Sequence, residues 1–397
     1  MRSNRKGQVF MKKPTVLFPY AEAGMGHIMP MNSIADAFEK KYGERVNIIR
    51  SSFFKDSGNP KLIKLEEVMA EQVKKQNRSP KYGYMTTNAM KFFGTHLSMY
   101  AMMHWLSIGS VKPGIKYMEE LGADMVVSTH WATNFYANKA KHKPITVQYV
   151  PDSHINPLFA YNSDLTMISM KSGYDAAMKK YRKYNEKNLK LVPFCIRNEA
   201  YQVSRDKGVN RENLGLNPNK FTITLAEGGY GIGKTQAICE EIVKRDLPVT
   251  LVPVCGKNEE LYSYLKSLKV GENTELVPQG FTTRILEFIA ASDLFMGKSG
   301  NIIAEPTFFG VPSVITNHAT EIEEIIGRYY VEDIGCAVKC FDPSKAADMV
   351  EDFIANPDSL IPLQENAKKN ADNYGAETTA DYIFELLAEK FPEIKEN

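Results

Sequence analysis

The feature that most constrains this fold is an alternation of short apolar runs with stretches of helical periodicity. In the first half, apolar runs of strand length lie at 15–18, 46–49, 125–128, 145–149 and 165–169. Helical patterns lie between them at 30–41, 114–121, 134–141 and 174–184. This alternation predicts a parallel sheet with helices on both faces.

The same alternation begins again after a turn-rich stretch at 210–220. We expect strands at 221–225, 249–254, 275–277, 294–296, 313–316 and 337–339. Helices are expected at 235–244, 259–268, 283–290, 302–309 and 321–330, and over roughly the last 50 residues. A chain of 397 residues exceeds one ordinary domain. We therefore predict an α/β chain of two doubly wound domains, with a cleft at the carboxyl ends of their strands.

The formal net charge of +2 conceals a strong asymmetry. Residues 1–200 contain 30 Lys and Arg against 16 Asp and Glu, a charge of +14. Residues 201–397 contain 19 against 31, a charge of −12. Such a split indicates two domains and a basic one that meets an anionic partner. Nucleic acid and an anionic membrane are the two candidates.

Several classes are excluded by composition and by segments the sequence lacks. The five cysteines form no CxxC pair, which argues against a disulfide scaffold or a zinc site and fits the reducing cytoplasm. The basic start is not followed by the apolar run of a secretory signal. No stretch reaches the roughly 18 apolar residues of a membrane span.

The first Gly-rich loop, at 23–27 (AGMGH), follows the first expected strand. Its glycines allow a ligand to approach the backbone, and the helix N-terminus after them favours negative charge. The alternative is a tight turn with no ligand.

The second loop, at 228–235 (GGYGIGKT), matches the GxxxxGK[ST] phosphate-binding pattern. A nucleotide triphosphatase is therefore one interpretation. Such enzymes need an acidic residue at the end of an apolar strand for Mg²⁺, whereas the later strands end at Cys255, Gly297 and Asn317. The pattern also leaves the basic first half unexplained, and a loop of this kind can bind a diphosphate without a role for Lys234.

The third loop, at 297–301 (GKSGN), again joins an expected strand to a helix. Its small residues and Ser299 suit a phosphate. Glu305 follows about one turn into the helix, within reach of a ribose diol. Alternatively, Glu305 is a solvated acid that complements the helix dipole.

Together the three loops resemble the GT-B glycosyltransferases, and most closely family 28. That family includes the monogalactosyldiacylglycerol synthases and the processive diacylglycerol glucosyltransferases. Residues 293–314 (DLFMGKSGNIIAEPTFFGVPSV) look like its strand, (K/R)xGxxTIAEA helix and G(L/V)P turn. The first loop with residues 33–38 looks like its GxGH opening, and residues 228–233 fall at its GGxxGxG donor loop.

The resemblance implies a GT-B fold of two Rossmann-like domains that face a central cleft. Residues 1–200 would form the acceptor and membrane domain, and residues 201–375 the nucleotide-sugar domain. A last helix at 376–397 would pack back on the first domain. The donor substrate would be a UDP-sugar, with no metal or other cofactor, because backbone N–H groups and a helix dipole would stabilise the leaving diphosphate.

The resemblance also implies donor-binding residues. Those near the diphosphate would be Gly229, Tyr230, Gly231, Lys298, Ser299 and Gly300. Further donor contacts would come from Gly24, Gly26 and Asn301. Gly280, Phe281 and Thr282 would lie near the uracil, and Glu305 would bind the ribose. Where many members have PGQExxN, this chain has acids, so Glu323 and Glu324 become candidates for the hydroxyls of the sugar.

On the acceptor side, His27 matches the family's loop histidine. It would accept the proton of the acceptor hydroxyl, or alternatively only position the substrate. His130 corresponds to a similar histidine after a strand. Asp152 and His154 form either an orienting residue with its base or a satisfied loop hydrogen bond. A single displacement with one base implies inversion.

The stretch 84–109 is rich in methionine and aromatic residues. Its candidates for contact with the acceptor or membrane are Phe92, Met99, Met102, Met103 and Trp105. The alternative is a buried helix of the first domain. The basic run at 61–81 has the composition of an amphipathic segment that binds anionic lipid, and a second basic cluster spans 171–190.

We therefore expect a peripheral enzyme of the cytoplasmic membrane that transfers glucose or galactose from a UDP-sugar to diacylglycerol or a glycosyl-diacylglycerol. A GT-B transferase with another acceptor, lipid-linked or soluble, is the main alternative, and a P-loop enzyme is a weaker one. RNA binding is disfavoured because the basic runs lack a Gly-aromatic recognition signature.

Overall fold

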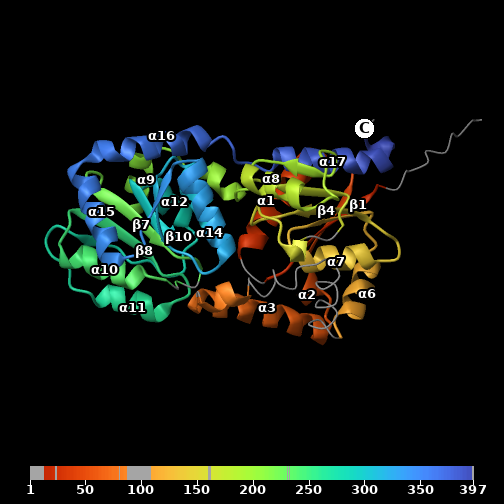
Figure 1. Cartoon of the computed structure of the whole chain (residues 1–397), viewed down its shortest axis with the longest axis horizontal. Coiled ribbons are helices and arrows are strands. Elements are labelled where there is room, and N and C mark those ends of the chain that lie inside the picture. The colour runs from red at the N-terminus through yellow and green to blue at the C-terminus, as the bar shows by residue number, and fades with distance from the viewer. Residues whose placement is uncertain are drawn as a thin grey trace, which may run out of the picture.

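A computed structural model describes residues 13–22, 25–79, 81–86, 109–159, 162–229, 231 and 233–395. It contains two six-stranded parallel sheets, with strand orders β2-β1-β3-β4-β5-β6 and β12-β11-β10-β7-β8-β9. Figure 1 shows the two sheets in separate α/β layers side by side along the long axis. The predicted pair of doubly wound units is confirmed.

The N-terminal half is built on the first sheet. Its strands are β1 Thr15–Tyr20, β2 Asn47–Ser52, β3 Met125–Ser128, β4 Ile145–Tyr149, β5 Leu165–Ile168 and β6 Leu189–Leu191. Its helices are α1 Met25–Tyr42, α2 Phe53–Asp56, α3 Pro60–Arg78, α6 Val111–Leu121, α7 Trp131–Lys139 and α8 Lys171–Lys180. Residues 81–86 are also helical, and η1 is Pro157–Phe159. The central strands are buried on both faces, which explains their nearly unbroken apolar sequences.

The C-terminal half repeats the arrangement. Its strands are β7 Phe221–Ala226, β8 Val249–Val254, β9 Glu275–Leu276, β10 Leu294–Lys298, β11 Ser313–Asn317 and β12 Ala337–Lys339. Its helices are α9 Lys207–Leu214, α10 Thr235–Lys244, α11 Glu259–Ser267, α12 Ile285–Ala290, α13 Ala304–Phe308, α14 Glu321–Arg328, α15 Pro343–Ala355 and α16 Ile361–Asn370. Shorter turns are η2 Asn198–Gln202, η3 Asn301–Ile303, η4 Tyr329–Asp333 and η5 Pro357–Leu360.

The last long helix, α17 Glu377–Lys390, returns to the N-terminal half and is followed by η6 Pro392–Lys395. Ile383 and Leu387 are fully buried in the core of the first sheet. The rings of Tyr42 and Phe384 stack with centroids 3.9 Å apart. In Figure 1, α17 lies along the first sheet, far in sequence from the strands that it covers. The domain boundaries at 200 and 375 stay predictions.

Several elements differ from the sequence expectations, among them β6 and α9. The edge strand β6 was not predicted, because it lies where the lysine-rich run at 171–190 ends. Lysine at a sheet edge discourages pairing with other chains. Helix α9 occupies the stretch expected to be a turn; Asp206 caps it by accepting from the N–H groups of Gly208 and Val209.

Candidate functional site

The first and third Gly-rich loops meet between the two halves. Asn301 Nδ2 donates to the Gly26 carbonyl oxygen at 3.3 Å. That carbonyl lies four residues before Pro30, which has no N–H to give it within α1. A Cβ atom on Gly26 would lie 3.2 Å from Asn301 Nδ2, so the two loops are in close contact here. Both loops follow the carboxyl ends of strands, where ligands bind in such folds.

His27 stands beside this contact in the first turn of α1. Its Nδ1 atom lies 2.8 Å from the Thr129 carbonyl oxygen, and the Thr129 hydroxyl donates to the His27 carbonyl at 2.9 Å. A carbonyl only accepts, so Nδ1 carries the proton and the lone pair of a neutral ring is on Nε2. Among the described residues, Nε2 makes no hydrogen bond. This geometry suits a general base.

His130 has a different environment from His27, although the two rings are only 5.2 Å apart. His130 is 3% exposed, and its Nδ1 accepts the Ala132 N–H at 3.2 Å as the cap of α7. Burial lowers the pKa of His130 well below its usual value, and the nearby His27 lowers it further. With Nδ1 in use on a neutral ring, Nε2 bears the proton. His130 therefore acts as a cap here and is a poor candidate for the predicted catalytic base.

Asp152 and His154 follow β4 on a loop that turns sharply at Ser153, whose φ is 50°. Burial raises the pKa of Asp152, His27 lowers it, and the negative charge of Glu323 raises it. Asp152 therefore interacts electrostatically with His27 of the N-terminal half and Glu323 of the C-terminal half. His154 is partly buried on the same loop. The catalytic roles of this pair stay predictions.

The third loop holds α14 in place. Lys298 Nζ pairs with Glu323 Oε1 at 2.6 Å, and the Ala319 N–H donates to Glu323 Oε2 at 2.6 Å. Ser299 is fully buried, with its hydroxyl donating to the Glu323 carbonyl and its N–H to the Asn317 carbonyl. Ser299 therefore supports α14, and neither of its donors is free for the predicted diphosphate contact. Gly300 has a φ of 141°, which suits glycine alone.

Glu305 is 7% exposed in α13, so the alternative of a solvated acid is wrong. Its Oε1 atom pairs with Arg197 Nη2. Glu305 Oε2 and Arg197 Nε have no hydrogen-bond partner among the described residues. Burial raises the pKa of Glu305, and Arg197 opposes that shift. The predicted ribose contact would use the unpartnered oxygen.

The second loop does not present an empty phosphate cradle. Glu227, 3% exposed, accepts from the Thr235 N–H at 2.7 Å and the Thr235 hydroxyl at 2.8 Å. Its other oxygen accepts from the Thr316 hydroxyl at 2.8 Å. A carboxylate thus occupies the N-terminus of α10, where a P-loop would place phosphate. Lys234 Nζ donates to the Phe341 carbonyl instead. The geometry therefore argues against the P-loop interpretation.

The other predicted donor residues are placed as follows. Gly229 and Gly231 lie in the turn after β7, where Gly231 has a φ of 56°. Gly280 and Thr282 flank Phe281, whose ring is 66% exposed with Lys257 Nζ 5.8 Å from its centroid. Glu324, on α14, accepts a hydrogen bond from Tyr84. Outside the described residues lie Gly24, Tyr230, Phe92, Met99, Met102, Met103 and Trp105.

Four residues of this region were missed by sequence reasoning. They are Tyr84, Arg197, Glu227 and His318. Glu227 had a local signal, because an acid before a Gly-rich loop can cap the following helix. Tyr84 and Arg197 act across long sequence separations, for which the sequence gives no local signal.

The basic runs are partly neutralised and well separated. In α3, Lys64 pairs with Glu67 at 3.0 Å and Lys74 with Glu71 at 2.7 Å. Figure 1 shows α3 and α8 at opposite edges of the N-terminal half. No helix in the described part of the chain is both long and apolar enough to cross a bilayer. The described residues also contain no cluster of three His, Cys, Asp or Glu side chains that could hold a metal.

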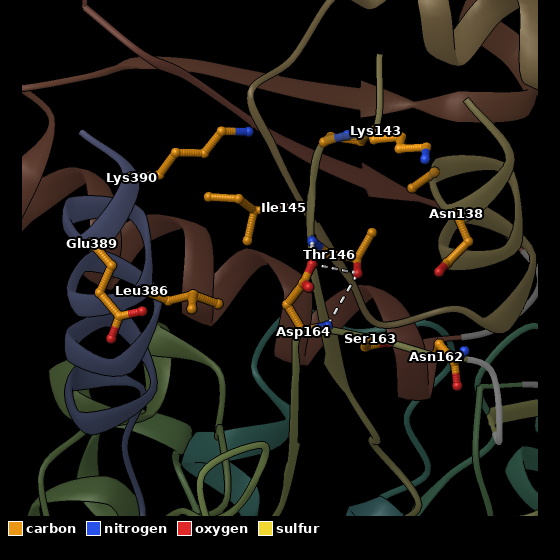
Figure 2. A pocket seen from close by; sticks show the side chains of 12 residues that line it. Asn138, Lys143, Ile145, Thr146, Asn162, Ser163, Asp164, Leu386, Glu389 and Lys390 are labelled. Atoms are coloured by element: carbon orange, nitrogen blue, oxygen red, sulfur yellow. Dashed lines mark hydrogen bonds between the residues drawn. The ribbon is translucent and has the colours of Figure 1, made fainter. Parts of the chain in front are cut away.

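A cavity of about 660 Å³ lies away from these loops, at the amino ends of β4 and β5. In Figure 2, Lys143 and Lys390 extend over Ile145, and Asp164 bonds Thr146 beneath them. The lysines are matched by the acids Asp164 and Glu389 among the lining residues. This cavity therefore contributes nothing to the chemistry at the opposite edge of the sheet.

Comparison with known proteins agrees with the geometry. No family model matches the chain. The chain is 29% identical over 183 residues to a processive diacylglycerol β-glucosyltransferase of Bacillus subtilis, covering 46% of this chain and 47% of that protein. It therefore spans about half the length of the first curated relatives that it matches. It is 24% identical over 373 residues to a probable monogalactosyldiacylglycerol synthase 2 of rice, covering 90% of this chain and 77% of that protein.

Solved structures establish the fold. A putative UDP-N-acetylglucosamine 2-epimerase from Listeria monocytogenes superposes with a TM-score of 0.62 at 14% identity, covering 96% of this chain and 98% of that one. An Anabaena protein in complex with UDP and glucose superposes with a TM-score of 0.55 at 15% identity, covering 95% and 100%. The chain has the GT-B fold, and its sequence resembles the diacylglycerol glycosyltransferases of family 28.

Proposed function

We propose that this chain is a GT-B glycosyltransferase that moves glucose or galactose from a UDP-sugar to diacylglycerol or a glycosyl-diacylglycerol. The observation that carries the proposal is the orientation of His27, which Thr129 holds beside the contact between Gly26 and Asn301. Its Nε2 atom makes no hydrogen bond to any described residue. A base at the junction of the two halves can serve an acceptor from one half and a donor from the other. The resemblance to glycolipid glycosyltransferases supplies the substrate classes.

The proposed reaction is a single displacement. His27 Nε2 takes the proton of the acceptor hydroxyl while the oxygen attacks the anomeric carbon of the sugar. The bond from that carbon to the diphosphate oxygen breaks, UDP leaves with the electron pair, and the configuration inverts. Asp152, whose carboxyl interacts electrostatically with His27, would stabilise the imidazolium that forms.

The donor would be held by the C-terminal half without a metal or other cofactor. Backbone N–H groups at Gly229 and Gly300 are candidates to receive the diphosphate, because glycine lets a ligand approach the backbone, whereas the Gly231 N–H donates to the Gly228 carbonyl at 3.0 Å. Glu305 is the candidate for the ribose, through its unpartnered oxygen. Phe281, with its exposed ring, is the candidate for stacking on the uracil.

We propose a peripheral location on the cytoplasmic membrane, with α3 toward the lipid. The exposed lysines of α3, among them Lys61 and Lys75, support attraction to an anionic surface. Co-sedimentation with anionic vesicles at low salt tests this part. Failure of the folded protein to bind would remove the membrane from the proposal.

Product analysis tests the transferase itself. Purified protein is incubated with diacylglycerol vesicles and UDP-glucose or UDP-galactose, with EDTA present. We expect a glycosylated lipid, with one molecule of UDP released for each sugar transferred. Isomerisation of the UDP-sugar without an acceptor, or product only from soluble acceptors, would contradict the proposed reaction or its acceptor.

A further inference from the structure

Helix α3 and residues 81–86 form a strut from the N-terminal half toward the C-terminal half. Figure 1 shows α3 along the lower edge, reaching toward α11 of the other half. The Glu66 carboxylate is 5% exposed and accepts the Glu22 N–H at 2.5 Å, just before the loop that leads to His27. The strut is thus tied to the chain just before the first Gly-rich loop.

The other end of the strut touches the loop before α14. Tyr84 donates its hydroxyl to Glu324 Oε2 at 2.6 Å. The Tyr84 ring also meets the His318 ring edge-on, with centroids 5.9 Å apart. Burial and the neighbouring Glu324 carboxylate raise the pKa of Tyr84, so its hydroxyl remains a donor. The same bond lowers the pKa of Glu324, which remains a carboxylate.

Backbone contact accompanies the hydrogen bond. A Cβ atom on Gly83 would lie 2.0 Å from the Ala319 carbonyl oxygen, so only glycine fits this approach. Ala319 is also the residue whose N–H donates to Glu323. The strut therefore touches the loop that leads into α14, the helix that carries both acidic candidates for the sugar hydroxyls.

The contacting segment is rigidly attached to α3. The Tyr82 hydroxyl donates to Gln72 Oε1 at 2.7 Å, and Gln76 Nε2 donates to the Thr86 hydroxyl at 3.1 Å. Both bonds remain within the strut. Tyr82 and Tyr84 thus each donate one hydroxyl hydrogen bond, Tyr82 to an amide within the N-terminal half and Tyr84 to a carboxylate of the other half.

We propose that Tyr84 is a positioning residue that completes the sugar subsite of the donor from the opposite half, by holding the Glu324 carboxylate toward the hexose. The inference rests on the proposed function, because it assigns the hexose of a UDP-sugar to Glu324. It implies that the nucleotide binds to the C-terminal half alone, whereas the hexose is recognised only when both halves are in contact. Tyr84 acts through Glu324 and does not itself touch the reacting atoms.

The test compares Tyr84→Phe with Tyr82→Phe, a control that loses a tyrosine hydroxyl bond to a neutral amide within the N-terminal half. Affinities for UDP, UDP-glucose and UDP-galactose are measured by calorimetry on the full chain, with steady-state KM and kcat. Loss of a bond to a charged group amounts to about tenfold or more. We expect Tyr84→Phe to lower the affinity about tenfold for whichever UDP-hexose the wild type binds more tightly. Its affinity for UDP should stay unchanged. Tyr82→Phe should bind both as the wild type does.

A double-mutant cycle with Glu324→Gln separates positioning from a general loss of structure. The two substitutions should be non-additive for UDP-hexose binding, because both remove the same bond. The inference would be overturned if Tyr84→Phe lowered the affinities for UDP and UDP-hexose equally, or if the two substitutions had additive effects on UDP-hexose binding. If the wild type binds neither UDP nor a UDP-hexose, the proposed function has failed instead.

Discussion

His27 and Thr129 hold each other through two hydrogen bonds, from Nδ1 to one carbonyl and from the Thr129 hydroxyl to the other, at 2.8 and 2.9 Å. The two residues are 102 positions apart in sequence. The pairing fixes both the ring orientation and the tautomer, so one nitrogen of the first Gly-rich loop is left basic.

The first prediction concerns that nitrogen. His27→Ala should lower kcat by about 10²- to 10⁴-fold, the usual contribution of a positioned base, and leave UDP affinity unchanged. His142→Ala is the matched control, because its ring bonds the Ala123 carbonyl at the amino ends of the strands. Turnover and UDP titrations check both variants. Full activity of His27→Ala would show that another group takes the proton.

The second prediction concerns Glu305. Glu305→Gln should lower the affinity for UDP about tenfold, because the lost bond is to the ribose diol. For the same reason it should reduce the preference for UDP over 2′,3′-dideoxy-UDP. Glu199→Gln, an exposed acid of η2, is the control and should bind both as the wild type does. An unchanged preference in Glu305→Gln would assign the ribose to another residue.

The third prediction concerns pH and Asp152. Burial raises the pKa of its carboxyl in the folded chain, so folding loses stability as the pH rises from about 4 through the folded pKa. Asp152→Asn should therefore be more stable than the wild type at pH 7 and equal to it at pH 3. Its activity should fall by about 100-fold or more if the carboxylate stabilises the His27 imidazolium.

Urea unfolding at the two pH values, with activity measured in parallel, tests the Asp152 prediction. Asp358→Asn, a change to an exposed aspartate, controls for the loss of a negative charge. Destabilisation of Asp152→Asn at pH 7 would mean that the carboxylate is held by bonds rather than penalised by burial.

The fourth prediction concerns the loop that resembles a P-loop. Glu227→Ala should lower the free energy of unfolding by about 3 kcal/mol, since it removes the acceptor of three buried donors.

Lys234→Ala should change UDP affinity by no more than about twofold, as for a surface substitution. Chemical denaturation and UDP titration provide the two measurements. A hundredfold loss of nucleotide affinity in Lys234→Ala would restore the P-loop interpretation.

The sequence predicted eleven of the twelve strands because each buried parallel strand carries its own apolar run. The exception, β6, has one buried leucine and an exposed one, Leu189 and Leu191, so its pattern was lost among lysines. Helix α9 was missed because its sequence, KGVNRENL, is mostly polar and its start is set by the Asp206 cap.

The site was predicted less completely than the fold. Local motifs indicated His27, Glu305 and the glycine loops, because those residues lie at strand ends within short patterns. The partners Arg197 and Tyr84 come from segments 108 and 240 positions away from the acids that they bind. Their positions depend on how the two halves pack, and no local pattern encodes that arrangement.

Pro30 leaves the Gly26 carbonyl without a donor in α1, so that this carbonyl can take part in the contact between the halves. If residue 30 had an N–H, the Gly26 carbonyl would accept it in the hydrogen-bond ladder of α1. Here the same carbonyl has Asn301 as its donor, at the long distance of 3.3 Å. Parting the loops therefore exchanges one weak bond for water, at a cost of about 1 kcal/mol, without unwinding any helix. Because position 30 is a proline, the bond between Asn301 and Gly26 can break and form again beside His27. Substrate entry can then leave α1 and the bonds from Thr129 to His27 intact.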